Sequence, residues 1–143
     1  MKTEPSTYSI DDLKKDKATL WEGVRNYQAR NFMKEMQVGD QVLFYHSSAE
    51  PPGIAGLAVV SKAAIADPSQ FKKGDYFEAK AKPDKPLWFC VEIKFNKKFG
   101  KFIPLDQLRE TKGIEGLMVL KRGQRLSVQP VDKSDFDTIV KLA

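Results

Sequence analysis

The stretch LWFCVEIKF, residues 87–95, decides the fold class because its side chains alternate like those of a half-buried β-strand. One face carries Leu87, Phe89, Val91, Ile93 and Phe95; the other carries Trp88, Cys90, Glu92 and Lys94. Two β-forming runs precede it, QVLFYH at 41–46 and GIAGLAVVSKAAI at 53–65. RLSVQPV at 125–131 also alternates, and its proline predicts an edge or bulge at its end. These four runs predict a sheet.

Two short helices are predicted around the first strands. Ser9 and Asp12, three residues apart, resemble a capping box that opens a helix over 10–15. Asn26 is a good N-cap for a second helix, which Gly39-Asp40 ends. Its apolar face would be formed by Ala29, Phe32, Met33 and Met36.

The C-terminal part predicts further helices, at 105–110 and 114–121, and a last one capped by Ser134 with Asp137. Strands are in the majority and do not alternate regularly with helices. The predicted fold class is therefore α+β: a small, curved, mostly antiparallel β-barrel or pseudobarrel with short surrounding helices, not a doubly wound parallel sheet.

The length and composition indicate one globular domain, residues 1–143. The 41% hydrophobic and 30% charged shares are ordinary for such a domain. No run of about 18 apolar residues occurs, and MKTEPSTYSI lacks an apolar signal core, so no membrane association is expected. Cys90 is the single cysteine, which excludes an internal disulfide and fits a cytoplasmic location.

The net charge of +5 is concentrated in residues 71–102, and the rest of the chain balances to zero. This stretch sets nine lysines (72, 73, 80, 82, 85, 94, 97, 98 and 101) against four acids (Asp75, Glu78, Asp84 and Glu92). A local excess of lysine attracts polyanions such as nucleic acid. A solvated face that only aids solubility is the alternative.

Catalytic signals are weak. One histidine and one cysteine cannot supply a metal cluster, and no phosphate-binding glycine loop occurs, so neither metal nor cofactor is expected. His46 and Ser47 are neighbours in a strand-like run and would point to opposite faces. We therefore expect no enzyme. The alternatives are a hydrolase or base-processing enzyme using Glu4 and His46 as an acid–base pair, or a module for a small molecule or a protein partner.

Binding signals are stronger, above all in WEGVRNYQARNF at 21–32. Flat faces come from Trp21, Tyr27, Tyr45 and Trp88, and edge donors and acceptors from Arg25, Asn26, Gln28, Arg30 and Asn31. Stacking combined with edge hydrogen bonds is how proteins read a nucleobase that has left its helix. Two alternatives stay open: Trp21 and Tyr27 as core residues with a satisfied polar end, and Arg25 or Arg30 as ligands of carboxylates within the fold.

Six stretches occur in an order that resembles the EVE domain, of the PUA-like superfamily that also includes YTH and ASCH domains: KTEPxxYSI, WEGVRNYQARNF, GDQVLFYHS, PPGIAGLAVV, DPSQF and LKRGQRLSVQPV. The resemblance covers nearly the whole chain. It implies a small β-barrel or pseudobarrel surrounded by short helices. It also implies a non-enzymatic reader of nucleic acid whose pocket accepts a flipped, often modified base.

Residue by residue, the resemblance implies a base pocket formed by four segments. They contribute Thr3, Glu4 and Pro5; Trp21, Val24, Arg25, Asn26 and Tyr27; Tyr45, His46 and Ser47; and Ser127, Val128 and Gln129. Trp21 or Tyr27 would stack on the base, and Asn26, Ser47 or Ser127 would read its Watson–Crick edge. A methyl or hydroxymethyl group on the base would fill a small subpocket.

Phosphate contacts are expected from exposed cations, namely Arg25, Arg30, Lys97, Lys98 and Arg125. The predicted partner is modified DNA or RNA, and both polymers remain open. A monomer is expected for a basic single domain.

Overall fold

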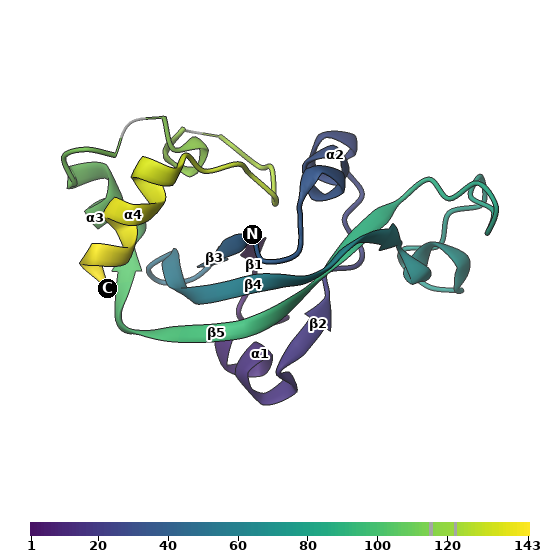
Figure 1. Ribbon diagram of the computed structural model, residues 1–143, viewed down its shortest axis with the longest axis horizontal. Coiled ribbons are helices and arrows are strands. Elements are labelled where there is room, and N and C mark those ends of the chain that lie inside the picture. Colours follow the sequence, from purple (N-terminus) through teal and green to yellow (C-terminus); the bar gives the residue numbers. More distant parts are fainter. Residues whose placement is uncertain (115, 122) are drawn as a thin grey trace.

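The computed structural model describes residues 1–114, 116–121 and 123–143 (Figure 1). Five strands form one sheet in the order β1-β3-β4-β5-β2. They are β1 (Lys2–Thr3), β2 (Ala18–Leu20), β3 (Gln41–His46), β4 (Gly53–Ala66) and β5 (Phe89–Pro104). β1 pairs with β3 in parallel, and the other three pairings are antiparallel.

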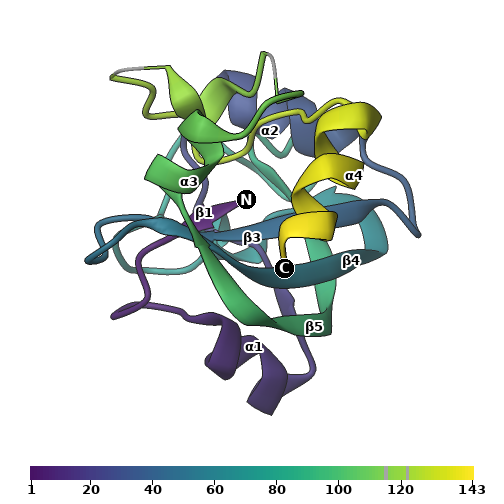
Figure 2. The ribbon, with the colours of Figure 1, turned by 90° about the vertical axis from the view of Figure 1, so that its left-hand side faces the viewer.

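Short helices surround this sheet: α1 (Ile10–Asp16), α2 (Tyr27–Glu35), α3 (Leu105–Glu110) and α4 (Lys133–Leu142), with 3₁₀ turns η1 (Pro68–Phe71) and η2 (Met118–Leu120). Helix α1 lies on one side of the sheet, and α2, α3 and α4 lie on the other (Figures 1 and 2). The α+β, mostly antiparallel fold class is confirmed. The sheet does not close into a complete barrel, because β1 and β2 are edge strands that do not pair with each other.

The sheet is strongly bent where β4 crosses β5. The register between these strands shifts at several points, which marks bulges. Two glycines of β4 are required there: a Cβ on Gly53 would lie 2.2 Å from the Ile103 carbonyl oxygen, and one on Gly56 would lie 2.3 Å from that of Lys97. The small residues of this run therefore permit the close strand approach that curves the sheet.

Helices α1 and α2 begin as the sequence predicts. Ser9 Oγ accepts from the backbone N–H of Asp12 while the Asp12 carboxylate accepts from Ser9 N–H, which completes the capping box. Asn26 Oδ1 accepts from Ala29 N–H at 2.9 Å. Ala29 and Met33 are buried in one core cluster, and Phe32 and Met36 pack against it. A second cluster fills the space around α3 and α4.

Three predictions of local structure are wrong. Residues 125–131 form no strand: Leu126 and Val128 are buried and Arg125 is exposed, but the segment's one contact with the sheet backbone is Lys2 N–H to the Ser127 carbonyl. The predicted helix 114–121 is only the turn η2; Glu115 and Arg122 lie outside the described residues. Helix α4 begins at Lys133 after Asp132, so Ser134 is inside it.

Residues 67–88, which we call the arm, connect β4 to β5 and project beyond the sheet (Figure 1). The fully buried amide of Gln70 ties its two ends together. Gln70 donates to the carbonyls of Asp67 and Trp88 and accepts from the N–H groups of Leu87 and Trp88. In the described part of the chain, no helix has the length and apolar character needed to span a membrane.

Candidate functional site

An open cavity of about 590 Å³ lies where β1, β2 and the loop before α2 meet the arm. Its volume falls within the roughly 300–1,000 Å³ typical of ligand sites. Six residues of the predicted base pocket line it: Thr3, Trp21, Val24, Arg25, Asn26 and Ser127. The fold therefore gathers three distant segments of the predicted pocket around one space.

The remaining predicted pocket residues do not line this cavity. Glu4 is exposed in the turn before α1, followed by half-buried Pro5. Tyr45 and Ser47 border a separate hollow beside Arg109 and Lys121. The pocket that the structure offers is thus smaller than the sequence predicts.

Two more predicted residues belong to the C-terminal segment but face away from the cavity. Val128 is fully buried in the core. Gln129 borders two other hollows beside β3, and its Nε2 donates to the Leu126 carbonyl at 2.7 Å. Of this segment, only Ser127 reaches the cavity.

His46 is held at the start of α1. Its Nε2 accepts a hydrogen bond from Ile10 N–H at 3.1 Å, and its ring packs against Phe44 and Phe102. Burial lowers the pKa of His46, which keeps the ring neutral. The imidazole nitrogen that would serve as a base is already occupied, so this geometry does not favour an acid–base pair of Glu4 and His46.

Trp21 forms the floor of the cavity. Its backbone N–H donates to the Val91 carbonyl at 2.9 Å, and its indole meets the ring of Phe44 edge-on, with centroids 5.7 Å apart. The side chain is half-buried and packs against the core. A fixed indole that borders open space is suited to stack on a flat ligand.

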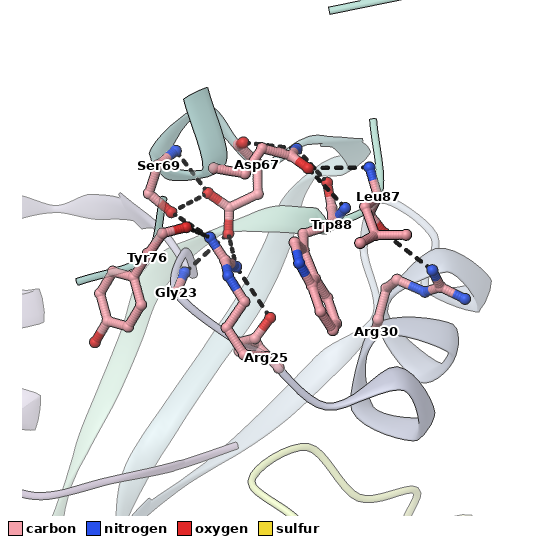
Figure 3. A network of polar contacts seen from close by, with 10 residues as sticks. Gly23, Arg25, Arg30, Asp67, Ser69, Tyr76, Leu87 and Trp88 are labelled. Carbon is pink, nitrogen blue, oxygen red and sulfur yellow. Dashed lines mark hydrogen bonds and ion pairs between the residues drawn. The ribbon is translucent and has the colours of Figure 1, made fainter. Parts of the chain in front are cut away.

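The cavity wall on the arm side is fixed by an ion pair that we call the Asp67–Arg25 clamp (Figure 3). Asp67, fully buried, accepts from Arg25 Nη1 at 3.2 Å and from Gly23 N–H at 2.8 Å. Its other oxygen accepts from the N–H and hydroxyl of Ser69. Arg25 also donates to the Val24 carbonyl, to Ser69 Oγ and to the Tyr76 carbonyl.

Burial alone raises the pKa of a carboxyl group, but the hydrogen bonds from Ser69, Gly23 and Arg25 outweigh it and lower the pKa of Asp67. Asp67 is therefore charged at neutral pH and holds the loop, Arg25 and the arm in one arrangement. Gly23 is required in it: its φ is +86°, and a Cβ would lie 2.8 Å from the ring of Tyr76.

Aromatic rings and guanidinium groups stack beside the clamp, and Figure 3 shows Arg25 between Tyr76 and Trp88. Arg25 lies over Tyr76 and Trp88, Tyr27 stacks on Trp88 at 4.8 Å, and Arg30 lies over Tyr27. Tyr27 thus packs on Trp88 and does not line the cavity. Trp88 Nε1 is buried and has no hydrogen-bond partner among the described residues.

The predicted phosphate ligands are scattered. The guanidinium of Arg25 is bound to acceptors within the protein, as part of the clamp. Arg30 donates to the Leu87 carbonyl and to Asn31 Oδ1. Lys97 and Lys98 are exposed on β5, where Lys98 pairs with Asp11 at 2.8 Å. These four side chains do not form one phosphate-binding surface at the cavity.

Arg125 is exposed two residues before Ser127, which is a cavity residue. It is the predicted phosphate ligand whose position and freedom still fit that role. Its contact with phosphate stays a prediction.

Sequence reasoning missed the other residues that line the cavity: Lys2, Thr7, Tyr8, Thr19, Leu20, Glu22, Gly23 and Tyr76. Tyr8 donates its hydroxyl to Asp16 at 2.9 Å, and burial together with that bond raises its pKa to about 12. Tyr76 comes from the arm, where its carbonyl accepts a hydrogen bond from Arg25 at 2.7 Å. In the part of the chain described, no group of three His, Cys, Asp or Glu residues could hold a metal ion.

Comparisons with known proteins agree with this architecture. The EVE domain model matches residues 1–142. Human thymocyte nuclear protein 1 is 40% identical over 161 residues, covering 99% of this chain and 72% of the relative. A crystal structure of a Pseudomonas putida protein has a TM-score of 0.94 at 42% identity, covering 99% of this chain and 96% of that one.

One of the similar solved structures is a complex with DNA. It is human THYN1 protein in complex with 5-methylcytosine-containing DNA, with a TM-score of 0.90 at 40% identity, covering 99% of this chain and 94% of that chain. The match of the family model over nearly every residue, together with these relatives, confirms the resemblance read from the sequence: this chain belongs to the EVE domain family.

Proposed function

We propose that this protein is a nucleic-acid-binding module that takes up an extruded, modified cytosine of DNA in the 590 Å³ cavity and catalyses no reaction on it. The observation that carries the proposal is the cavity itself, with the Trp21 indole at its floor and polar side chains around it. The relative crystallised with 5-methylcytosine-containing DNA supports DNA as the polymer and modified cytosine as the base.

Recognition would divide between stacking and edge contacts. Trp21 would stack on the base, and stacking on an aromatic side chain contributes about 1–3 kcal/mol per base. Around it, the Asn26 amide and the hydroxyls of Thr3 and Ser127, which line the cavity, would meet the polar edge of cytosine. Asn26 Oδ1 already caps α2, so its amide N–H₂ group would act as the donor.

The methyl group of 5-methylcytosine would add a small amount to the binding free energy. Burying one methyl-sized group contributes about 0.8 kcal/mol, which is roughly a fourfold preference for 5-methylcytosine over cytosine. Extruding a base from a duplex costs a few kcal/mol, so a single strand should bind more tightly than a matched duplex.

The test is a fluorescence-anisotropy titration with oligonucleotides that differ only in one cytosine, 5-methylcytosine or 5-hydroxymethylcytosine, as single-stranded DNA, duplex DNA and RNA. Trp21→Ala should weaken binding of the preferred base by about 5- to 150-fold, the equivalent of 1–3 kcal/mol. Trp21→Phe should weaken binding less, because a phenyl ring keeps an aromatic face and much of the packing against the core. Phe77→Ala removes an exposed aromatic outside the cavity lining and should bind like wild type.

The result distinguishes recognition of the base from non-specific electrostatic binding to the nucleic-acid backbone. A base preference that Trp21→Ala abolishes, with circular dichroism showing an intact fold, supports the proposal. Salt-sensitive binding with no preference among bases and no effect of Trp21→Ala would refute it, because a lysine-rich surface alone behaves in that way.

A further inference from the structure

A second, smaller hollow of about 180 Å³ lies on the arm directly beside the cavity. It is lined by Glu22, Ser69, Lys72, Lys73, Gly74, Asp75 and Tyr76. Glu22 and Tyr76 also line the cavity, so the two spaces share one wall. A polymer that leaves the cavity across this wall has its next unit close to this hollow.

We propose that this hollow binds the backbone phosphate of the nucleotide next to the base held in the cavity, with Lys72 and Lys73 as its cationic ligands. This inference rests on the proposed function and adds to it a specific phosphate subsite. Both lysines are exposed and belong to the lysine-rich stretch 71–102, whose role the sequence left open. Lysine is a common phosphate ligand because its ammonium group acts as a compact point charge.

The wall between the spaces is held by contacts of Arg25. The guanidinium of Arg25 donates to Ser69 Oγ at 3.0 Å and to the Tyr76 carbonyl at 2.7 Å, and it lies over the Tyr76 ring. Ser69 and Tyr76 both line the hollow. The clamp that shapes the cavity therefore shapes the hollow as well, without using either lysine.

The other cations are less well placed. Lys97 and Lys98 lie on β5, where neither borders the cavity or the hollow, and Arg30 is bonded to Leu87 and Asn31. Lys80 and Lys82 lie further along the arm and do not line the hollow. Among the cations of the arm, Lys72 and Lys73 are the two that border a space adjoining the cavity. Arg109 and Lys121 line another hollow, which shares Lys2 with the cavity but neither Glu22 nor Tyr76.

The hollow also contains two acids, and they sharpen the inference. Glu22 and Asp75 offset the charge of Lys72 and Lys73, so the hollow has no formal net charge. If a phosphate enters it, removing the lysines must weaken binding and removing the Asp75 charge must strengthen it. A surface that merely gathers counterions over the whole arm would not distinguish Asp75 from another acid of the arm.

The experiment measures affinity for a single-stranded oligonucleotide with one 5-methylcytosine, between about 50 and 200 mM salt. A single strand removes the cost of base extrusion. The variants are Lys72→Ala/Lys73→Ala and Asp75→Asn. The matched controls carry the same charge changes elsewhere on the arm, Lys80→Ala/Lys82→Ala and Asp84→Asn; all three control residues are exposed.

Loss of one phosphate contact should reduce the slope of log K against log salt by about 0.7 and weaken binding about fivefold at 0.1 M salt. Asp75→Asn should strengthen binding about twofold at 0.1 M salt, because a like charge roughly 6 Å away in water is worth about threefold before the salt screens it. The control variants should change affinity far less. The ratio of affinities for 5-methylcytosine and cytosine should stay at its wild-type value in every variant.

Equal effects of the two lysine pairs, or no strengthening by Asp75→Asn, would overturn the phosphate subsite while leaving base reading intact. If wild type shows no base preference but the lysine and Asp75 variants behave as expected, the proposed function fails and the subsite stands. Absence of any binding by wild type overturns both.

Discussion

Replacing Asp67 by asparagine is expected to lower the free energy of unfolding by about 3 kcal/mol at neutral pH. Each carboxylate oxygen of Asp67 accepts two hydrogen bonds: one from Gly23 and Arg25, the other from the N–H and hydroxyl of Ser69. An asparagine amide turned either way presents its N–H₂ group to one of these donor pairs. Two part-buried donors then lose their acceptor.

Each unsatisfied buried group costs about 1–3 kcal/mol, which gives a range of about 2–6 kcal/mol for two. The lower half of that range is expected, because the Arg25 side chain is 22% exposed and keeps its other acceptors. The effect should shrink in acid. The pKa of Asp67 is lowered in the folded state, so its contribution is present above the unfolded value of about 3.9 and is lost as the pH falls through the folded value.

The measurement is urea unfolding followed by tryptophan fluorescence, at pH 7 and again in acid. With a denaturant slope of roughly 1–3 kcal/mol/M, the midpoint should fall by about 1–3 M at pH 7. Asp84→Asn, an exposed acid on the same arm, should stay within about 0.5 kcal/mol of wild type. If Asp67→Asn also stays within about 0.5 kcal/mol, the clamp does not hold the arm and the reasoning is refuted.

Three further outcomes are expected. Gly23→Ala should destabilise by about 1–3 kcal/mol and weaken oligonucleotide binding, because of its positive φ and the Tyr76 ring; equal thermal unfolding temperatures would contradict this. Cys90, buried with a pKa raised to about 12, should react with a thiol reagent only in denaturant. Because the pKa of His46 is lowered, wild-type stability should fall as the pH drops below about 6.5, and more steeply than that of His46→Gln.

Local hydrogen bonding made the first two helices predictable. The capping box of α1 and the Asn26 cap of α2 join residues three apart, so a single short stretch contains the whole signal. The strand predicted at 125–131 is wrong because alternation of apolar and polar residues indicates which side chains are buried, not whether the backbone pairs with another strand. Leu126 and Val128 do point inward, but of its backbone only the Ser127 carbonyl is bonded to a strand, through Lys2 N–H.

The candidate site was predictable in part for a related reason. Trp21 and Asn26 lie in one polar, aromatic stretch that the sequence displays. Tyr76 is brought there by a bond to Arg25 across 51 positions, and Asp67 by one across 42. An arginine in a polar stretch looks the same whether its acceptor is a distant carboxylate or a phosphate. Only the three-dimensional structure separates the two, and it assigns Arg25 to the clamp.

Two side chains close to the end of β4 fix the base of the arm: Asp67 binds the loop before α2, and Gln70 ties the two ends of the arm together. Beyond them, residues 72–85 are exposed or half-buried and contribute nothing to either core cluster. Insertions, deletions and substitutions there should be tolerated by the fold, while they change the surface at the mouth of the cavity. We therefore expect proteins of this architecture that prefer different targets to differ mainly in residues 72–85 of the arm, while the sheet and its core clusters stay the same.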